Sequence, residues 1–157
     1  MEPIEQPVIR AAAETEAAQL SSLAMRSKAY WGYSDEFMEA CRDELTLTAE
    51  DLRSKPTWVA EADSEVVGFY ALAPLSADEA ELGFLFVEPA AIGHGYGRAL
   101  IEHAKAQARE MGYRTLVIPG DPNAERFYLA AGGVVVGTTP SGSIPGRELP
   151  LFHIELG

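Results

Sequence analysis

The chain has 157 residues, of which 47% are hydrophobic and 23% are charged, an ordinary composition for a soluble globular protein. Its length suits a single domain, residues 1–157, with a core of its own. With 24 acids against 12 bases the net charge is −12, which argues against a nucleic-acid partner because phosphate contacts need clustered Lys and Arg.

The sequence also argues against a membrane partner, since no apolar run approaches the roughly 20 residues that span a bilayer. The start, MEPIEQPVIR, carries acids and prolines where a signal peptide carries basic and then apolar residues. A cytoplasmic location is therefore expected, and the single cysteine excludes an internal disulfide framework. The acidic charge would suit a cationic substrate such as an amine, although acidic surfaces usually serve solubility.

The first third of the chain predicts one strand followed by helices. Residues 7–12 are typical of a strand, and residues 15–30 carry an approximate helical stripe with Thr15 as the expected N-cap. Ser34 precedes two acids in the pattern of a second capped helix, and Thr48 opens a short third one.

After Pro56 the pattern changes to strands and helices in turn. Val, Phe and Tyr dominate residues 57–62 and 65–75, which flank Asp63-Ser64 as an antiparallel hairpin would. The further elements expected are strands at 79–87, 113–118, 134–139 and 149–156 and helices at about 97–111 and 121–131. This order predicts a mixed α/β domain.

The most informative segment is VEPAAIGHGYGRAL, residues 87–100, in which alternating glycines lie between a strand and an amphipathic helix. Glycine permits a positive φ and lets backbone approach a ligand with no Cβ in the way. The first N–H groups of a helix lack internal partners, and the helix dipole makes that end partly positive. The segment therefore predicts a pocket for phosphate oxygens, with Arg98 adding a full charge.

Two other phosphate motifs do not fit this segment. No Lys-Ser/Thr follows the glycines as in a P-loop, and the spacing G-x-G-x-G differs from the G-x-G-x-x-G of a Rossmann fingerprint. On the loop alone, a tight strand-to-helix turn without a ligand stays open as the alternative.

At these residues the chain resembles the GNAT family, the acetyl-CoA-dependent N-acetyltransferases. IGHGYG at residues 92–97 occupies the family signature Gln/Arg-x-x-Gly-x-Gly/Ala, with Ile92 in place of the usual Gln or Arg. DPNAERFYLAAGG at residues 121–133 resembles the second motif, an Asn-x-x-x-x-Phe-Tyr helix ending in Gly-Phe, with Gly133 in place of Phe. The resemblance is specific over residues 57–133 and rests on element order before that.

The resemblance implies a splayed, mixed and mostly antiparallel sheet of about seven strands flanked by helices. Residues 82–87 would part from residues 116–118, and the pantetheine of acetyl-CoA would lie between them; no metal is implied. The backbone of Leu85, Phe86 and Val87 would bond the pantetheine amides. The residues that would hold the pyrophosphate are Ile92, through its main chain, and Gly93, His94, Gly95, Tyr96, Gly97 and Arg98. Asn123 and Phe127 would flank the lower arm of CoA.

Acyl transfer to an amine needs a base, because an alkylamine with a pKa of about 10 is protonated at neutral pH. By resemblance to the glutamate of the family's Ala-Glu-Leu strand, Glu81 is the expected base and Glu79 and Glu88 are weaker candidates. Backbone donors near the parted strands would stabilise the oxyanion. Tyr128 matches the tyrosine that protonates the departing thiolate. A solvated strand glutamate and a core tyrosine remain the alternatives.

The acceptor side is expected around Trp31 and Tyr33, where family members commonly build the substrate pocket, although a plain helix-loop anchor is an alternative. Loop 140–147 either borders the same pocket or covers an edge strand. The chain's histidines show no metal-ligand spacing.

The expected activity is direct transfer of an acetyl group from acetyl-CoA to a primary amine of a small molecule. Acetylation of a protein N-terminus or lysine is a second interpretation. A non-catalytic acyl-CoA-binding regulatory module is a third; Ile92 favours it, while Glu81 and Tyr128 argue against it. The acceptor and acyl length are not fixed by sequence, and a homodimer paired through the closing strands stays open.

Overall fold

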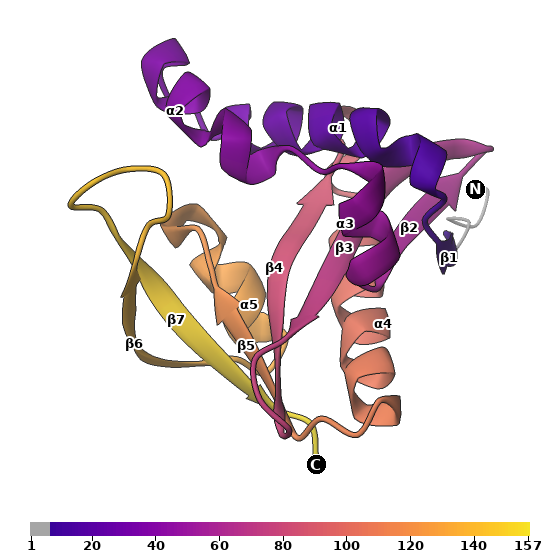
Figure 1. Cartoon of the computed structure of the whole chain (residues 1–157), viewed down its shortest axis with the longest axis vertical. Coiled ribbons are helices and arrows are strands. Elements are labelled where there is room, and N and C mark those ends of the chain that lie inside the picture. Colours follow the sequence, from indigo (N-terminus) through magenta and orange to yellow (C-terminus); the bar gives the residue numbers. More distant parts are fainter. Residues whose placement is uncertain (1–6) are drawn as a thin grey trace.

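The computed structural model describes residues 7–157. Seven strands form one open sheet in the order β1-β2-β3-β4-β5-β7-β6, and only β4 and β5 pair in parallel (Figure 1). The strands are β1 (Val8–Ala11), β2 (Thr57–Ala62), β3 (Glu65–Pro74), β4 (Glu79–Val87), β5 (Thr115–Pro119), β6 (Val134–Pro140) and β7 (Glu148–Glu155). The helices are α1 (Ala17–Ala29), α2 (Asp35–Leu45), α3 (Ala49–Ser54), α4 (Tyr96–Glu110) and α5 (Glu125–Ala130), with 3-10 turns η1 (Glu14–Glu16), η2 (Pro89–Ala91) and η3 (Pro122–Ala124). The predicted fold class is confirmed.

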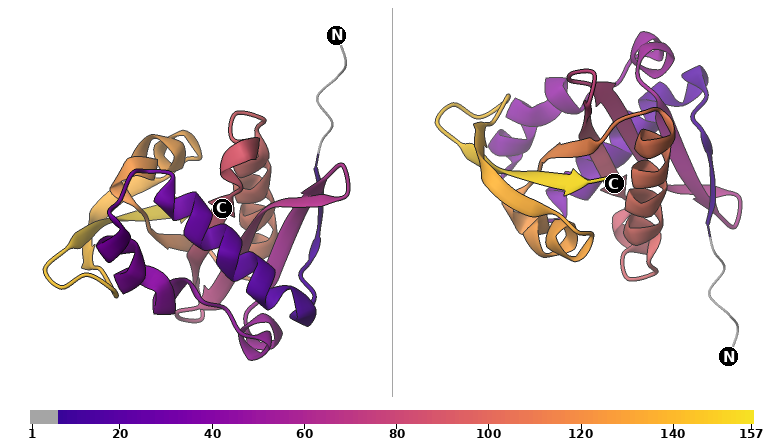
Figure 2. Two further views of the ribbon diagram at one scale, coloured as in Figure 1. Left: turned by 90° about the horizontal axis from the view of Figure 1, so that it is seen from above. Right: turned by 90° about the horizontal axis from the view of Figure 1, so that it is seen from below.

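Two hydrophobic cores lie on opposite faces of the sheet, which the views from above and below show (Figure 2). On one face α1, α2 and α3 pack against Val59 and Phe69. On the other face α4 and α5 pack against Tyr70, Leu116 and Phe152. The two faces of the sheet are therefore covered by different sets of helices.

Local signals in the sequence account for most element boundaries. The Ser34 Oγ accepts a hydrogen bond from the Phe37 N–H at 3.1 Å and caps α2, as expected. Asp63 and Ser64 adopt φ of 52° and 66°, the left-handed pair that joins β2 to β3. The expected cap at Thr15 is wrong: Thr15 lies inside η1, whose start is fixed by the Glu16 carboxylate accepting from the Ala13 N–H at 2.8 Å.

The parallel pair β4 and β5 separates soon after it begins, as predicted. Its register runs only from Glu79↔Thr115 to Glu81↔Val117, and the two ribbons then diverge (Figure 1). On its other side β4 stays paired to β3, with a register shift that leaves Gly83 without a partner. A bulge of this kind bends a strand, so one edge of β4 is left open beyond Glu81.

Within residues 7–157, no helix combines the length and the apolar character needed to cross a membrane. Residues 1–6, whose two acids and one proline contributed to the expected location, lie outside the described residues.

Candidate active site

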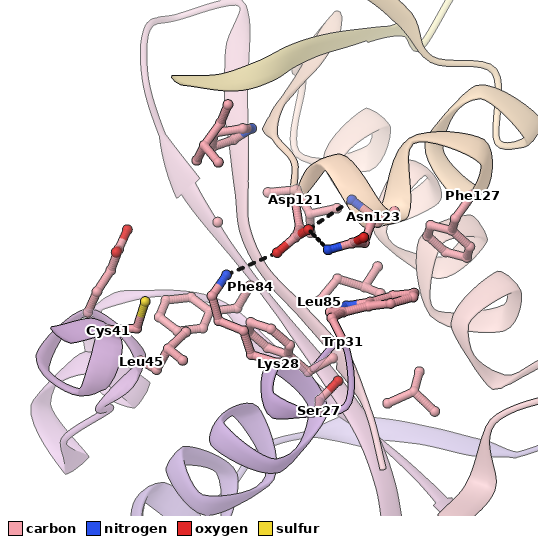
Figure 3. A pocket seen from close by; sticks show the side chains of 18 of the residues that line it. Ser27, Lys28, Trp31, Cys41, Leu45, Phe84, Leu85, Asp121, Asn123 and Phe127 are labelled. Atoms are coloured by element: carbon pink, nitrogen blue, oxygen red, sulfur yellow. Dashed lines mark hydrogen bonds and ion pairs between the residues drawn. The ribbon is translucent and has the colours of Figure 1, made fainter. Parts of the chain in front are cut away.

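A cleft of about 1070 Å³ opens where β4 and β5 part (Figure 3). Its wall includes β4, the glycine loop, the start of α5, the end of α1 and the loop between β6 and β7. The predicted site residues found in the lining are Trp31, Glu81, Leu85, Phe86, Val87, Ile92, Gly93, Gly95, Tyr96, Gly97, Arg98, Asn123, Phe127 and Tyr128. Tyr33 and His94 are outside it, and the His94 ring stacks on Tyr96.

The glycine loop has the form of an anion cradle. Gly93 and Gly95 adopt φ of +95° and +81°, and a Cβ on either would meet nothing within 4 Å. Within residues 7–157, the backbone N–H groups of residues 93–98 have no hydrogen-bond acceptor, and the first bond of α4 runs from Ala99 N to Gly95 O at 3.0 Å. Free donors at the start of a 15-residue helix fit the phosphates of a CoA thioester.

The open edge of β4 offers main-chain groups to an extended ligand. Glu88 N bonds Val67 O at 2.8 Å, and antiparallel pairing alternates, so Phe86 and Phe84 also direct their main-chain groups at β3. The main-chain groups of Leu85 and Val87 then face the gap. These two residues fit the amides of a pantetheine arm, whereas Phe86 contributes its side chain to the α1 face.

Gly97 lets the α4 start approach α5 closely. A Cβ at this position would lie 3.1 Å from Cε1 of Phe127 and 3.6 Å from Cγ2 of Val87. The absence of a side chain therefore brings the cradle, the edge of β4 and the α5 aromatic to one narrow stretch of the cleft.

Glu81 occupies the last paired position before the strands part, opposite Val117. Its carboxylate lies over the bulge, where a Cβ on Gly83 would be 3.2 Å from Oε1. Glycine at the bulge thus keeps space beside this carboxylate, which reaches the cleft. The geometry puts a proton acceptor at the fork of the sheet.

Tyr128 is 7% exposed and still reaches the cleft. Its ring packs against Phe152 and Phe127, with ring centroids 5.3 Å and 5.2 Å away. Among the described residues, every fully buried polar side-chain atom has a hydrogen-bond partner. The Tyr128 hydroxyl has no such partner within residues 7–157, so it is not fully buried, and it is open to the cleft. Burial and the nearby Asp121 charge raise the pKa of Tyr128, which keeps the phenol protonated at neutral pH.

On the side of the cleft where the acceptor is expected, Trp31 is 46% exposed at the wall, and its ring centroid lies 5.7 Å from that of Tyr30. Tyr33 is instead held behind the wall. Its ring stacks on Phe37 at 4.1 Å, and its hydroxyl donates to Asp121 Oδ2 at 2.7 Å. Burial, followed by this contact with Asp121, raises the pKa of Tyr33 to about 12.

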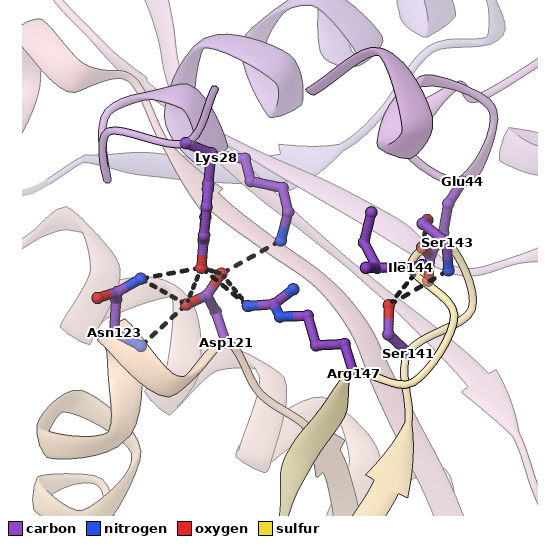
Figure 4. A network of polar contacts seen from close by, with 9 residues as sticks. Lys28, Glu44, Asp121, Asn123, Ser141, Ser143, Ile144 and Arg147 are labelled. Atoms are coloured by element: carbon purple, nitrogen blue, oxygen red, sulfur yellow. Dashed lines mark hydrogen bonds and ion pairs between the residues drawn. The ribbon is translucent and has the colours of Figure 1, made fainter. Parts of the chain in front are cut away.

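Asp121 is the centre of a polar network that joins four elements (Figure 4). It accepts from Asn123 N at 2.9 Å and from Lys28 Nζ at 3.2 Å, and Arg147 Nη2 is 3.7 Å away. Burial alone would raise the pKa of Asp121, but the Asn123 N–H, the Tyr33 hydroxyl and the Lys28 charge outweigh it and lower that pKa.

The loop between β6 and β7, residues 141–147, closes over the acceptor side. Ser143 donates to the Glu44 carboxylate at the end of α2, and Ile144 packs against the α1–α2 core. Arg147 Nη2 donates to the Tyr33 hydroxyl at 2.9 Å. The loop is thus tied to the helices and borders the cleft, which resolves the two interpretations that the sequence left open.

Sequence reasoning did not identify Lys28, Asp121 or Arg147 as site residues. Asp121 directly precedes Pro122 in the pattern of a helix cap, and it does cap η3. No local sequence pattern connects these residues, because Lys28 lies 93 positions from Asp121 and Arg147 lies 114 positions from Tyr33.

Comparison with known proteins agrees with the geometry. Residues 20–132 match the profile of the Acetyltransferase (GNAT) family. The peptidyl-lysine N-acetyltransferase YjaB of Salmonella typhimurium is 34% identical over 122 residues, covering 76% of this chain and 79% of that protein. The 5-NmdU N-acetyltransferase of Pseudomonas phage PaMx11 is 31% identical over 148 residues, covering 92% of this chain and 96% of that protein.

Solved structures share the fold. The PaiA N-acetyltransferase of Thermoplasma acidophilum, solved with coenzyme A, superposes with a TM-score of 0.78 at 21% identity, covering 96% of this chain and 99% of that one. A GCN5-related N-acetyltransferase of Rhodopseudomonas palustris gives 0.82 at 24% identity, covering 99% of both chains. The profile match, together with the glycine cradle and the open edge of β4, shows that this chain belongs to the GNAT family of acetyl-CoA-dependent N-acetyltransferases.

Proposed function

We propose that the protein acetylates a primary amine of a small molecule by direct transfer from acetyl-CoA. The observation that carries this proposal is that the β6–β7 loop is bonded across the acceptor side, to the α1–α2 loop through Arg147 and Tyr33 and to α2 through Ser143 and Glu44. A cleft with a loop bonded across one end suits a compact acceptor better than an extended peptide. The sequence-based expectation of a cytoplasmic protein stays a proposal.

In this mechanism Glu81 accepts a proton and Tyr128 donates one. Acetyl-CoA supplies an activated thioester to the gap beside β4. The Glu81 carboxylate takes the proton of the acceptor ammonium, which frees the nitrogen lone pair for attack. The Tyr128 hydroxyl donates a proton to the departing sulfur, and its raised pKa keeps that proton available. The nitrogen gives up its second proton as the C–S bond breaks, and this proton restores the Tyr128 phenol. The acceptor thereby becomes an amide, CoA leaves as the thiol, and the proton on Glu81 passes to solvent.

A second candidate, acetylation of peptidyl lysine, is favoured by one finding. The Salmonella relative that is 34% identical is named a peptidyl-lysine N-acetyltransferase. A lysine side chain would have to reach the fork past the β6–β7 loop, so this activity requires that loop to open. A regulatory module that binds acyl-CoA without turnover is the remaining alternative.

The test combines ligand stabilisation with turnover. Thermal unfolding is followed with CoA and acetyl-CoA, and thiol release is then measured against small amines and lysine-containing peptides. Ligand at about 100 times its Kd should add roughly 2.7 kcal/mol to the free energy of unfolding. Release with small amines supports the proposal, release only with peptides supports the second candidate, and stabilisation without release supports the regulatory module.

A further inference from the structure

We propose that the acceptor amine also carries an oxyanion, a carboxylate or a phosphate, which Lys28 and Arg147 bind at the acceptor side of the cleft. This inference rests on the proposed function, because it names the substrate class for the same site. The two basic side chains line the cleft and converge on Asp121 from α1 and from the β6–β7 loop (Figure 4).

Asp121 has little capacity left for a substrate. Its Oδ1 accepts from Asn123 N at 2.9 Å and from Asn123 Nδ2 at 3.0 Å. Its Oδ2 accepts from the Tyr33 hydroxyl at 2.7 Å and from Lys28 at 3.2 Å. A carboxylate that is bonded this fully serves to position its neighbours, and it is not available to recognise the ammonium of an acceptor.

The two cations, in contrast, have donors to spare. Among residues 7–157, the Lys28 Nζ bonds only Asp121, and the Arg147 guanidinium bonds only through Nη2, which leaves Nε and Nη1 without an acceptor. Their side chains are only 15% and 18% exposed. Such poorly hydrated charged donors are costly unless an anion meets them, and one carboxylate neutralises only one of the two charges.

Among residues 7–157, no acid of the lining other than Asp121 forms an ion pair with Lys28 or Arg147. Glu44 accepts from Ser143, and Asp51 accepts from Thr48 N at 2.9 Å in the capping box of α3. Lys28 and Arg147 share the single carboxylate of Asp121, so this cluster is locally positive on a chain whose net charge is −12.

Aromatic packing holds the guanidinium in place. The Arg147 Cζ lies 5.3 Å from the ring centroid of Tyr33 and 5.0 Å from that of Phe37, and these two rings are stacked. Lys28 Nζ lies 5.4 Å from the Tyr33 centroid. A planar, stacked guanidinium with free donors is the group that binds carboxylate and phosphate most specifically.

Lys28 and Arg147 lie apart from the glycine cradle, where the CoA phosphates would bind. Lys28 belongs to α1 and the Tyr33–Phe37 stack belongs to the α1–α2 layer, on one face of the sheet. The glycine cradle opens α4, which packs on the opposite face. The oxyanion bound by Lys28 and Arg147 therefore belongs to the acceptor, whose amine would lie toward Glu81.

Matched pairs of amines test the inference. β-Alanine is compared with β-alaninamide, and O-phosphoethanolamine with ethanolamine, by thiol release and by thermal shift of the CoA-bound protein. A charge-assisted contact should give the anionic member of at least one pair a kcat/KM about 10- to 100-fold higher. The pair that shows the preference identifies carboxylate or phosphate as the bound group.

Variants assign the preference to this site. Arg147→Met and Lys28→Met should remove it mainly through the acceptor KM, while the CoA-induced thermal shift is retained. Arg53→Met is the control, since Arg53 is exposed, pairs with Glu14 and lies outside the cleft lining. That control should keep the preference of the parent protein.

The outcomes separate this inference from the proposed function. Turnover of the neutral amines equal to or above that of the anionic ones overturns the inference and leaves the proposed function standing. Without turnover of any small amine the proposed function fails, and the thermal shift decides the inference. A shift with the anionic member alone, lost in Arg147→Met, supports it; the lack of such a shift overturns it.

Discussion

Glu81 and Tyr128 approach the fork of the sheet from different elements, β4 and α5, and their surroundings differ. Glu81 lies beside a bulge that glycine keeps open, whereas Tyr128 is buried among aromatic rings with its hydroxyl at the cleft. A carboxylate near solvent suits proton abstraction, and a buried phenol suits proton donation.

The first prediction concerns Glu81. Glu81→Gln keeps the size and polarity of the side chain but removes the base, so kcat should fall by about 10²- to 10⁴-fold. CoA affinity, measured by thermal shift, should not change. Glu79→Gln, two residues earlier on β4 and outside the cleft lining, is the matched control. Equal kcat in the parent protein and Glu81→Gln would exclude Glu81 as the base.

The second prediction concerns Tyr128. Tyr128→Phe should lower kcat by about 100-fold and change the free energy of unfolding by less than about 1 kcal/mol, because no hydrogen bond within the described residues is lost. Since burial raises the pKa of Tyr128, activity that depends on this proton should persist up to the ordinary tyrosine pKa of about 10. A loss of activity in Tyr128→Phe that follows a loss of stability would instead indicate a packing role.

At the scale of elements, α4 shows how one helix combines packing with ligand binding. Glycines in the left-handed region flank it, Gly95 at φ +81° before it and Gly112 at φ +94° after it, and neither has a neighbour within 4 Å of an added Cβ. Backbone strain from alanine is therefore similar at the two ends, and only the first end faces the cleft.

Gly95→Ala and Gly112→Ala should each cost about 1–2 kcal/mol of unfolding free energy through left-handed strain. Only Gly95→Ala adds a methyl group to the phosphate cradle, so its CoA affinity should drop at least about tenfold while that of Gly112→Ala stays near the parent value. Isothermal titration with CoA measures both. Similar affinities in the two variants would refute the cradle.

At the scale of the whole molecule, the Asp121 network ties α1, the start of η3 and the β6–β7 loop across the cleft. Together with the Ser143–Glu44 contact, it holds the helical layer and the hairpin of β6 and β7 together (Figure 4). Its strength depends on the charge of Asp121, whose pKa is lowered in the folded state.

Because the pKa of Asp121 is lower in the folded than in the unfolded state, its charge stabilises the fold above the unfolded-state pKa of about 3.9. This stabilisation is lost as the pH falls through the folded-state pKa. At neutral pH, Asp121→Asn should therefore lower the free energy of unfolding by about 1–3 kcal/mol. The difference between the parent and this variant should shrink below about pH 4. Urea denaturation across pH 3–7 measures it, and a difference independent of pH would contradict a role for the charge.

The sequence by itself determined the order of the elements, the fold class and the glycine loop that lines one part of the cleft. Caps such as Ser34, turns such as Asp63-Ser64 and the alternating glycines of residues 93–97 act through neighbours within a few positions, so they can be predicted locally. The motif that starts α4 would also carry its own ligand contacts, because the free backbone donors belong to consecutive residues.

The acceptor side was decided only by tertiary structure. Lys28, Asp121 and Arg147 come from three distant segments, and their charges meet only because the hairpin of β6 and β7 folds back against α1. The same folding placed Tyr33 behind the wall and His94 outside it, since the side of a loop that faces a cleft is set by packing of the whole sheet. Coulombic and hydrogen-bonding partners far apart in sequence leave no local pattern to detect.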